Sequence, residues 1–161
     1  MRLIASFTLW LFVLGTALIL GAGLYEALVV VPFWSAGAPA SLAEGNPLLQ
    51  VPIRSGQVFW PFFTPALGVI ALLALATGFG TPPRHFAWRV AATGLLLIVS
   101  IATLIYFRPT IVRMVIDHGG GHTPEAITQE ANRWVALNWL RVLAVAASLA
   151  MGVRALLLPL K

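Results

Sequence analysis

The sequence contains no cysteine and very little charge. Of its 161 residues only 9% are charged, ten basic and five acidic, whereas 60% are hydrophobic and the mean hydropathy is +0.93. A soluble domain carries about 25% charged residues, so the composition excludes a water-soluble globule and a disordered chain. Without cysteine, disulfides, iron–sulfur clusters and thiolate chemistry are excluded as well. The basic residues are scattered singly, so we expect no nucleic-acid partner despite the net charge of +5. The lipid bilayer is the partner that this composition requires.

Long stretches without charge predict four membrane-spanning helices. A bilayer core about 30 Å thick is crossed by roughly 20 apolar residues in helical conformation. Apolar runs of this length are too long for barrel strands, and backbone polar groups in lipid must be satisfied internally. The fold class is therefore all-α, an integral membrane four-helix bundle that forms a single domain over residues 1–161. We expect its helices near 6–32, 58–80, 86–107 and 125–158.

The distribution of lysine and arginine predicts the orientation. One side holds both termini and the short turn at 81–85, with five basic residues and no acidic one. The other side holds five basic residues, which all five acidic residues balance. We therefore expect a multi-pass protein of the bacterial inner membrane with both termini cytoplasmic. Two long outer loops are expected near 34–57 and 108–124, because Pro109 should kink or end the third helix.

Glu26 is the most informative single residue. The apolar run of the first helix continues past it to Pro32, which places this carboxylate at the outer interface or up to about 9 Å below it. A carboxylate at that depth is costly and marks a functional or a paired site. Its natural partner is Arg141 on the last helix. The sequence leaves open whether the pair serves function or only joins two helices.

Three polar or aromatic residues share one face of the last helix. Trp134, Asn138 and Arg141 follow one another at spacings of four and three. Depending on where the helix leaves the membrane, Arg141 is either buried about two turns deep or snorkels at the outer edge. Arg108, beside Pro109, is expected at the outer rim.

Two histidines raise the question of a metal. His118 and His122 lie in a glycine-rich outer loop, with Asp117 beside them, and this set could hold zinc or copper. A loop of this composition without a third firm ligand is more often only a loop. No histidine lies inside a predicted span, so a buried haem lacks its usual ligand. We expect no cofactor, with a metal or haem at this loop as the alternative.

Two short motifs resemble a known family. The segment RWVALNWLR, with Trp134, Asn138 and Arg141, is similar to the opening of the last helix in the anthrone-oxygenase-like family of small four-helix membrane proteins. YFRPT, with Pro109, is similar to the end of that family's third helix, and VVVPFW after the first-helix glycines also fits. The family usually has asparagines around the third-helix proline, where Arg108 and Thr110 stand here.

The resemblance implies an activity. Characterised relatives oxidise anthrones to anthraquinones with dioxygen, without metal or flavin, which implies a lipophilic phenolic or quinone-like aromatic substrate. Glu26 would then be the base, and Asn138 and Arg141 would stabilise the oxyanion. Trp134, Trp139 and Arg108 would bind the substrate.

Two other functions remain open at this point. The small size and the lack of a nucleophile elbow or phosphate loop also fit a non-enzymatic subunit of a larger membrane complex. A metal- or haem-binding membrane protein that uses His118 and His122 is the third possibility. The oligomeric state is equally open, and a homo-oligomer is one option.

Overall fold

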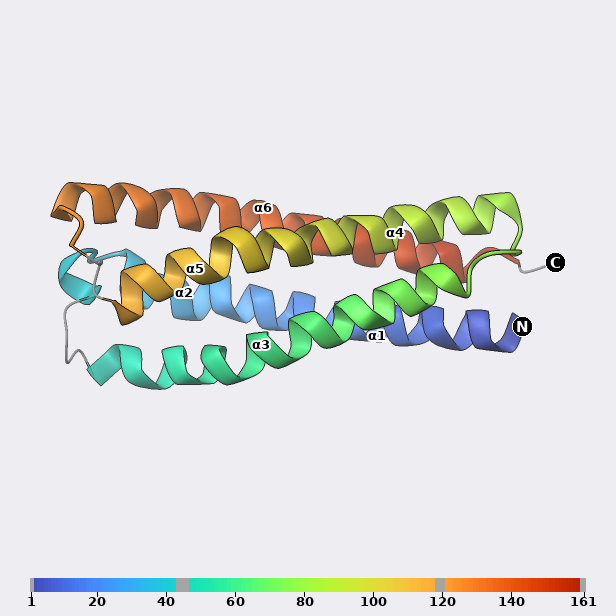
Figure 1. The fold of residues 1–161 in the computed structure, drawn as a ribbon, viewed down its shortest axis with the longest axis horizontal. Coiled ribbons are helices and arrows are strands. Elements are labelled where there is room, and N and C mark those ends of the chain that lie inside the picture. The colour runs from blue at the N-terminus through green and yellow to red at the C-terminus, as the bar shows by residue number, and fades with distance from the viewer. Residues whose placement is uncertain (1, 43–46, 118–120, 160–161) are drawn as a thin grey trace.

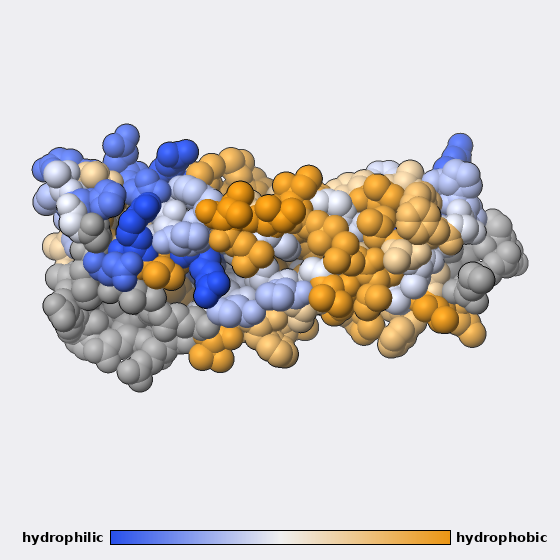
Figure 2. Space-filling view, viewed as in Figure 1, coloured by the Kyte–Doolittle hydropathy of each residue, from blue (hydrophilic) through white to orange (hydrophobic). Residues whose placement is uncertain are grey.

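The computed structural model describes residues 2–42, 47–117 and 121–159. In this part of the chain, four helices are long and apolar enough to cross a membrane, and they run side by side along the molecule (Figure 1). Both termini lie at the same end, and we call the opposite end the outer end (Figure 1). Hydrophobic side chains cover the middle of the molecule and hydrophilic ones gather at its two ends (Figure 2). The all-α four-helix bundle expected from the sequence is confirmed, and the protein is a multi-pass membrane protein.

We call each of the four membrane-spanning helices, together with any π-helical segment that it contains, a rod. Two of the four rods are continuous helices and two contain π-helical segments. The second rod is α3 (Pro47–Ala76) and the fourth is α6 (Pro124–Leu156). The first rod consists of α1 (Arg2–Tyr25), η1 (Glu26–Val30) and α2 (Val31–Ser35), and a short 3-10 turn, η2 (Ala40–Leu42), follows it. The third rod consists of α4 (Pro83–Ala102), η3 (Thr103–Phe107), α5 (Arg108–Ile111) and η4 (Val112–Ile116).

The third helix does not end near residue 107 as expected, and of the two alternatives at Pro109, a kink or an end, the structure excludes the end. The helix passes through this proline and reaches Ile116, just as the first rod passes through Pro32. Proline lacks an N–H group and crowds the carbonyl four residues before it. A π segment ends two residues before each proline, and its wider turn accommodates the missing bond without breaking the helix. Helices therefore take up much of both expected outer loops: the third rod reaches Ile116 within 108–124, and α3 begins at Pro47 within 34–57.

The packing differs between the two halves of the bundle. In the inner half, one apolar core draws residues from all four rods, including Phe12, Leu67, Leu96 and Val145. In the outer half, the core around Trp134 is built from the first, third and fourth rods, and none of its described members comes from α3. The outer part of α3 lies apart from α5 (Figure 1). A cavity lined by residues of α3 and of the third rod lies in this half.

The inner end is held together by a buried cation. Arg89 is 0% exposed and its guanidinium donates a hydrogen bond to the carbonyl of Ala5. The side chain packs on Gly78, where a Cβ atom would lie 2.6 Å from Cδ of Arg89. The glycine is thus needed for close approach, not for its backbone conformation.

We expect Gly78→Ala to lower the free energy of unfolding by about 1–3 kcal/mol, the usual cost of overpacking. Gly94→Ala on α4 is the matched control, because a Cβ atom there meets nothing within 4 Å. The control should raise stability by about 1 kcal/mol, since alanine is the better helix former. Thermal unfolding in detergent measures both variants. Equal stability of the two would contradict the packing of Arg89 on Gly78.

Candidate functional site

A cavity of about 470 Å³ opens in the outer half, mainly between α3 and the third rod. We call it the outer cavity. Its volume lies within the range of about 300–1,000 Å³ that is typical of small-molecule sites. Its lining is largely apolar and comes from all four rods, and it includes Glu26, Trp34, Trp60, Phe107, Trp134 and Arg141. Polar groups converge at one point of this lining.

That point is an ion pair between the first and the last helix. Arg141 Nη2 donates to Glu26 Oε2 at 2.7 Å, and Trp60 Nε1 donates to Glu26 Oε1 at 3.1 Å. Each carboxylate oxygen therefore has one donor and keeps further lone-pair positions. The side chains of Arg141 and Glu26 are 10% and 21% exposed. The carboxylate is thus partly accessible and held in place by two donors.

Arg141 is also held by two aromatic rings. Its guanidinium carbon lies 5.3 Å from the ring centre of Trp60 and 4.8 Å from that of Phe107. A cation over an aromatic face is attracted by the ring quadrupole, most strongly where water is scarce. The structure places Arg141 inside the bundle, at the lining of the outer cavity.

The outer wall of the cavity is a fixed aromatic cluster. The Trp134 ring packs edge-on against Trp34, with ring centres 5.3 Å apart, and against Phe107, with ring centres 5.7 Å apart. The Nε1 group of Trp134 donates to the Phe107 carbonyl at 3.1 Å. This bond satisfies the buried indole and fixes the orientation of its ring. The result is a tightly packed aromatic cluster at the wall of the outer cavity.

The π-helical segments contribute directly to the site. Glu26 is the first residue of η1, and Phe107 is the last residue of η3. π segments inside α-helices occur frequently at functional sites, where they re-aim side chains. The prolines that follow each segment are the sequence signal that could have pointed to them. Nothing in the sequence showed that Trp60 and Phe107 would enclose Arg141, because this depends on how three helices meet.

Two residues expected at the site do not line the cavity. Asn138 is 1% exposed, and its Oδ1 has no hydrogen-bond partner among the described residues. Trp139 is 38% exposed on another face of α6, because consecutive residues of a helix point about 100° apart. Arg108, by contrast, lines the outer cavity with an exposed side chain.

The histidine loop lies away from the ion pair. His122 borders a separate cavity of about 250 Å³ near the outer surface, together with Arg113, Glu130 and Arg133. His118 lies outside the described residues. Within the described ranges, no group of three His, Cys, Asp or Glu side chains could hold a metal ion.

Comparison with protein families gives one match. The sequence profile of the family described as anthrone oxygenase matches residues 53–151. This segment runs from α3 into α6 and contains both motifs on which the resemblance rested, together with Trp60 and Arg141. The comparisons with curated proteins and with solved structures gave no match. Because the matched segment covers more than half of the 161 residues, the chain belongs to the anthrone oxygenase family.

Proposed function

We propose that this protein is a cofactor-independent oxygenase that converts an anthrone-like, lipophilic phenolic substrate into a quinone in the outer cavity. The observation that carries the proposal is the Glu26–Arg141 pair, which faces an apolar cavity of small-molecule size within the membrane-spanning region. An ionisable pair at such a position is by default a candidate functional site.

The reaction is anthrone plus dioxygen giving anthraquinone plus water. A base removes one proton from the ring methylene and leaves an enolate, whose charge is shared between the oxygen and the methylene carbon. This carbon gives its electron pair to dioxygen, a C–O bond forms, and the resulting peroxide anion takes up a proton. Loss of the second methylene proton with cleavage of the O–O bond leaves the new carbonyl and hydroxide, which is protonated to water. The substrate carbanion itself supplies the electrons.

Glu26 and Arg141 suit the first step. The carboxylate keeps lone-pair positions open and can accept the methylene proton. When Glu26 becomes neutral, the enolate oxygen takes over as the counterion of Arg141, so the negative charge moves only a short way. Arg141 has further N–H groups beyond the one bound to Glu26, and these can stabilise the oxyanion. The low polarity of the cavity strengthens this interaction.

The aromatic lining suits the substrate. Trp34, Trp60, Phe107 and Trp134 line the outer cavity, and an aromatic lining is suited to contact a flat polycyclic ring. A lipophilic substrate partitions into the bilayer, and the outer cavity is lined by residues of all four membrane-spanning rods. Arg108 at the cavity lining can contact a phenolic oxygen of the substrate.

Labelled dioxygen tests the proposed activity. Protein purified in lipid nanodiscs is supplied with an anthrone under ¹⁸O₂, and the products are examined by mass spectrometry. We expect one ¹⁸O atom in the quinone and one in water, at a rate well above spontaneous oxidation in protein-free nanodiscs. The absence of enzyme-dependent turnover would contradict the proposal. A stoichiometric second polypeptide in the same preparation would instead favour a subunit of a larger complex.

A further inference from the structure

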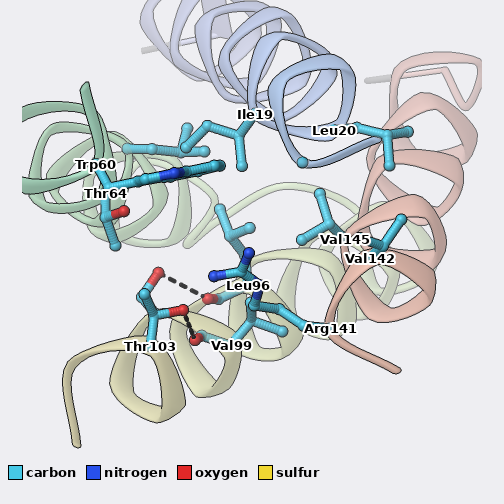
Figure 3. A pocket seen from close by; sticks show the side chains of 13 residues that line it. Ile19, Leu20, Trp60, Thr64, Leu96, Val99, Thr103, Arg141, Val142 and Val145 are labelled. Carbon is cyan, nitrogen blue, oxygen red and sulfur yellow. Dashed lines mark hydrogen bonds between the residues drawn. The ribbon is translucent and has the colours of Figure 1, made fainter. Parts of the chain in front are cut away.

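A second, smaller cavity lies on the inner side of Arg141. We call it the inner cavity. Its volume is about 30 Å³, and side chains of all four rods surround it, among them Leu20, Leu96 and Val145 (Figure 3). One water occupies about 10–15 Å³ on this measure, so the space admits one or two very small molecules and no aromatic ring.

The inner and outer cavities adjoin at the ion pair. Four residues line both of them, namely Trp60, Thr64, Thr103 and Arg141. A molecule in the inner cavity is therefore separated from a substrate in the outer cavity by this shared boundary alone. The guanidinium of Arg141 borders both spaces.

The inner cavity has a mainly apolar lining. Two of its three hydroxyls are turned towards their own helix: Thr103 donates to the Val99 carbonyl at 2.8 Å (Figure 3), and Ser100 donates to the Leu96 carbonyl at 2.9 Å. The third hydroxyl, that of Thr64, and the Arg141 guanidinium lie at the boundary with the outer cavity, and the rest of the lining is mainly aliphatic, with side chains such as Ile19 and Leu20. A buried water needs two to four polar partners, whereas small apolar cavities stay dry and bind apolar guests such as xenon. This lining therefore favours an apolar diatomic gas over water.

We propose that the inner cavity is the dioxygen site. This inference rests on the proposed function, because dioxygen is the second substrate of that reaction. From this position dioxygen meets the substrate carbanion across the shared boundary and accepts its electron pair to form the peroxide. The new negative charge then arises beside Arg141, where a fixed cation stabilises it.

Filling the inner cavity tests its role separately from the role of the outer cavity. Gly23 lines the inner cavity, and a Cβ atom there makes only an ordinary contact of 3.7 Å with Val142. The first carbon of a side chain at this position therefore fits without a clash, and Gly23→Val adds two further methyl groups at the wall of the inner cavity. Gly21→Val, two residues earlier on the same helix, is the matched control, because a Cβ atom at Gly21 meets nothing within 4 Å. Val145→Ile adds one methylene from α6 and serves as a second filling variant.

Xenon is the probe that does not depend on activity. We expect xenon to bind the wild-type protein and Gly21→Val in the inner cavity, seen by ¹²⁹Xe NMR or in xenon-pressurised crystals, and to be lost from Gly23→Val. In turnover, Gly23→Val should raise the KM for dioxygen by about tenfold or more and leave the KM for the anthrone unchanged. Val145→Ile should shift both readouts in the same direction.

The outcomes distinguish this inference from the proposed function. If the wild-type protein turns over the anthrone but binds no xenon in the inner cavity, the dioxygen site is overturned and the proposed oxygenase activity is retained. An unchanged KM for dioxygen in a folded Gly23→Val that has lost xenon would overturn it as well. Xenon binding in a wild-type protein that oxidises no anthrone would overturn the proposed function, and the dioxygen site with it.

Discussion

Replacing Glu26 by glutamine is expected to lower the turnover of an anthrone by about 10³-fold, within the range by which a general base accelerates proton removal. Glutamine has nearly the same shape, and its amide oxygen can still accept the hydrogen bond from Trp60 Nε1. It cannot accept the methylene proton. The loss should therefore appear in kcat, with little change in the KM for the anthrone, and initial rates of quinone formation measure both.

The control for this variant is a carboxylate outside the cavity. Glu130 Oε1 lies 3.8 Å from Arg113 Nη2 near the outer surface. Glu130→Gln removes the same charge from the protein without changing the pair of Glu26 and Arg141. It should turn over the anthrone at the wild-type rate. Full activity in Glu26→Gln, or an equal loss in both variants, would remove Glu26 from the role of the base.

Replacing Arg141 by methionine is expected to abolish measurable turnover and also to destabilise the protein. Removing one partner of a buried ion pair costs about 3–5 kcal/mol, because the other charge is left uncompensated. We expect about 3 kcal/mol, the lower end of this range, because the Glu26 side chain retains 21% exposure. Thermal or denaturant unfolding in detergent gives the loss of stability, and the anthrone assay gives the loss of activity.

The double variant Glu26→Gln/Arg141→Met separates structure from catalysis. With no charge left in the pair, it should regain most of the stability lost in Arg141→Met. It should remain inactive, because both the base and the oxyanion partner are absent. If the double variant recovered both stability and activity, the pair would be only a connection between two helices. If it recovered neither, the stability of the site would depend on the contacts of Arg141 with the rings of Trp60 and Phe107 rather than on its ion pair with Glu26.

The structure gives a physical reason for the helix that continues through Pro109 and for the position of Trp139 away from the outer cavity. Pro109 indicates a helix end by the local rule that a proline removes a hydrogen bond, yet the π segment before it lets the helix continue. Trp139 was expected at the substrate because it lies beside Asn138 and Arg141 in sequence. The helical rotation between neighbouring residues turns it away, whereas Trp60 from α3 is positioned there instead.

The sequence by itself determined the class of the protein, its four spans and its family. These follow from properties that are local along the chain: the length of apolar runs, the scarcity of charge, and the short motifs around Pro109 and Arg141. It also singled out Glu26 and Arg141, because a charge within an apolar run is conspicuous whatever the fold. The expectation that they are partners rested on depth alone.

Only the tertiary structure decided what surrounds this pair. Three features depend on how the four rods pack against one another: the contact between Glu26 and Arg141, the rings of Trp60 and Phe107 beside the guanidinium, and the two adjoining cavities. The angles between helices result from side-chain packing summed over whole helix faces, and apolar side chains of similar hydropathy pack differently because their shapes differ. Hydropathy specifies that a helix lies in the membrane, whereas shape specifies where the helices part.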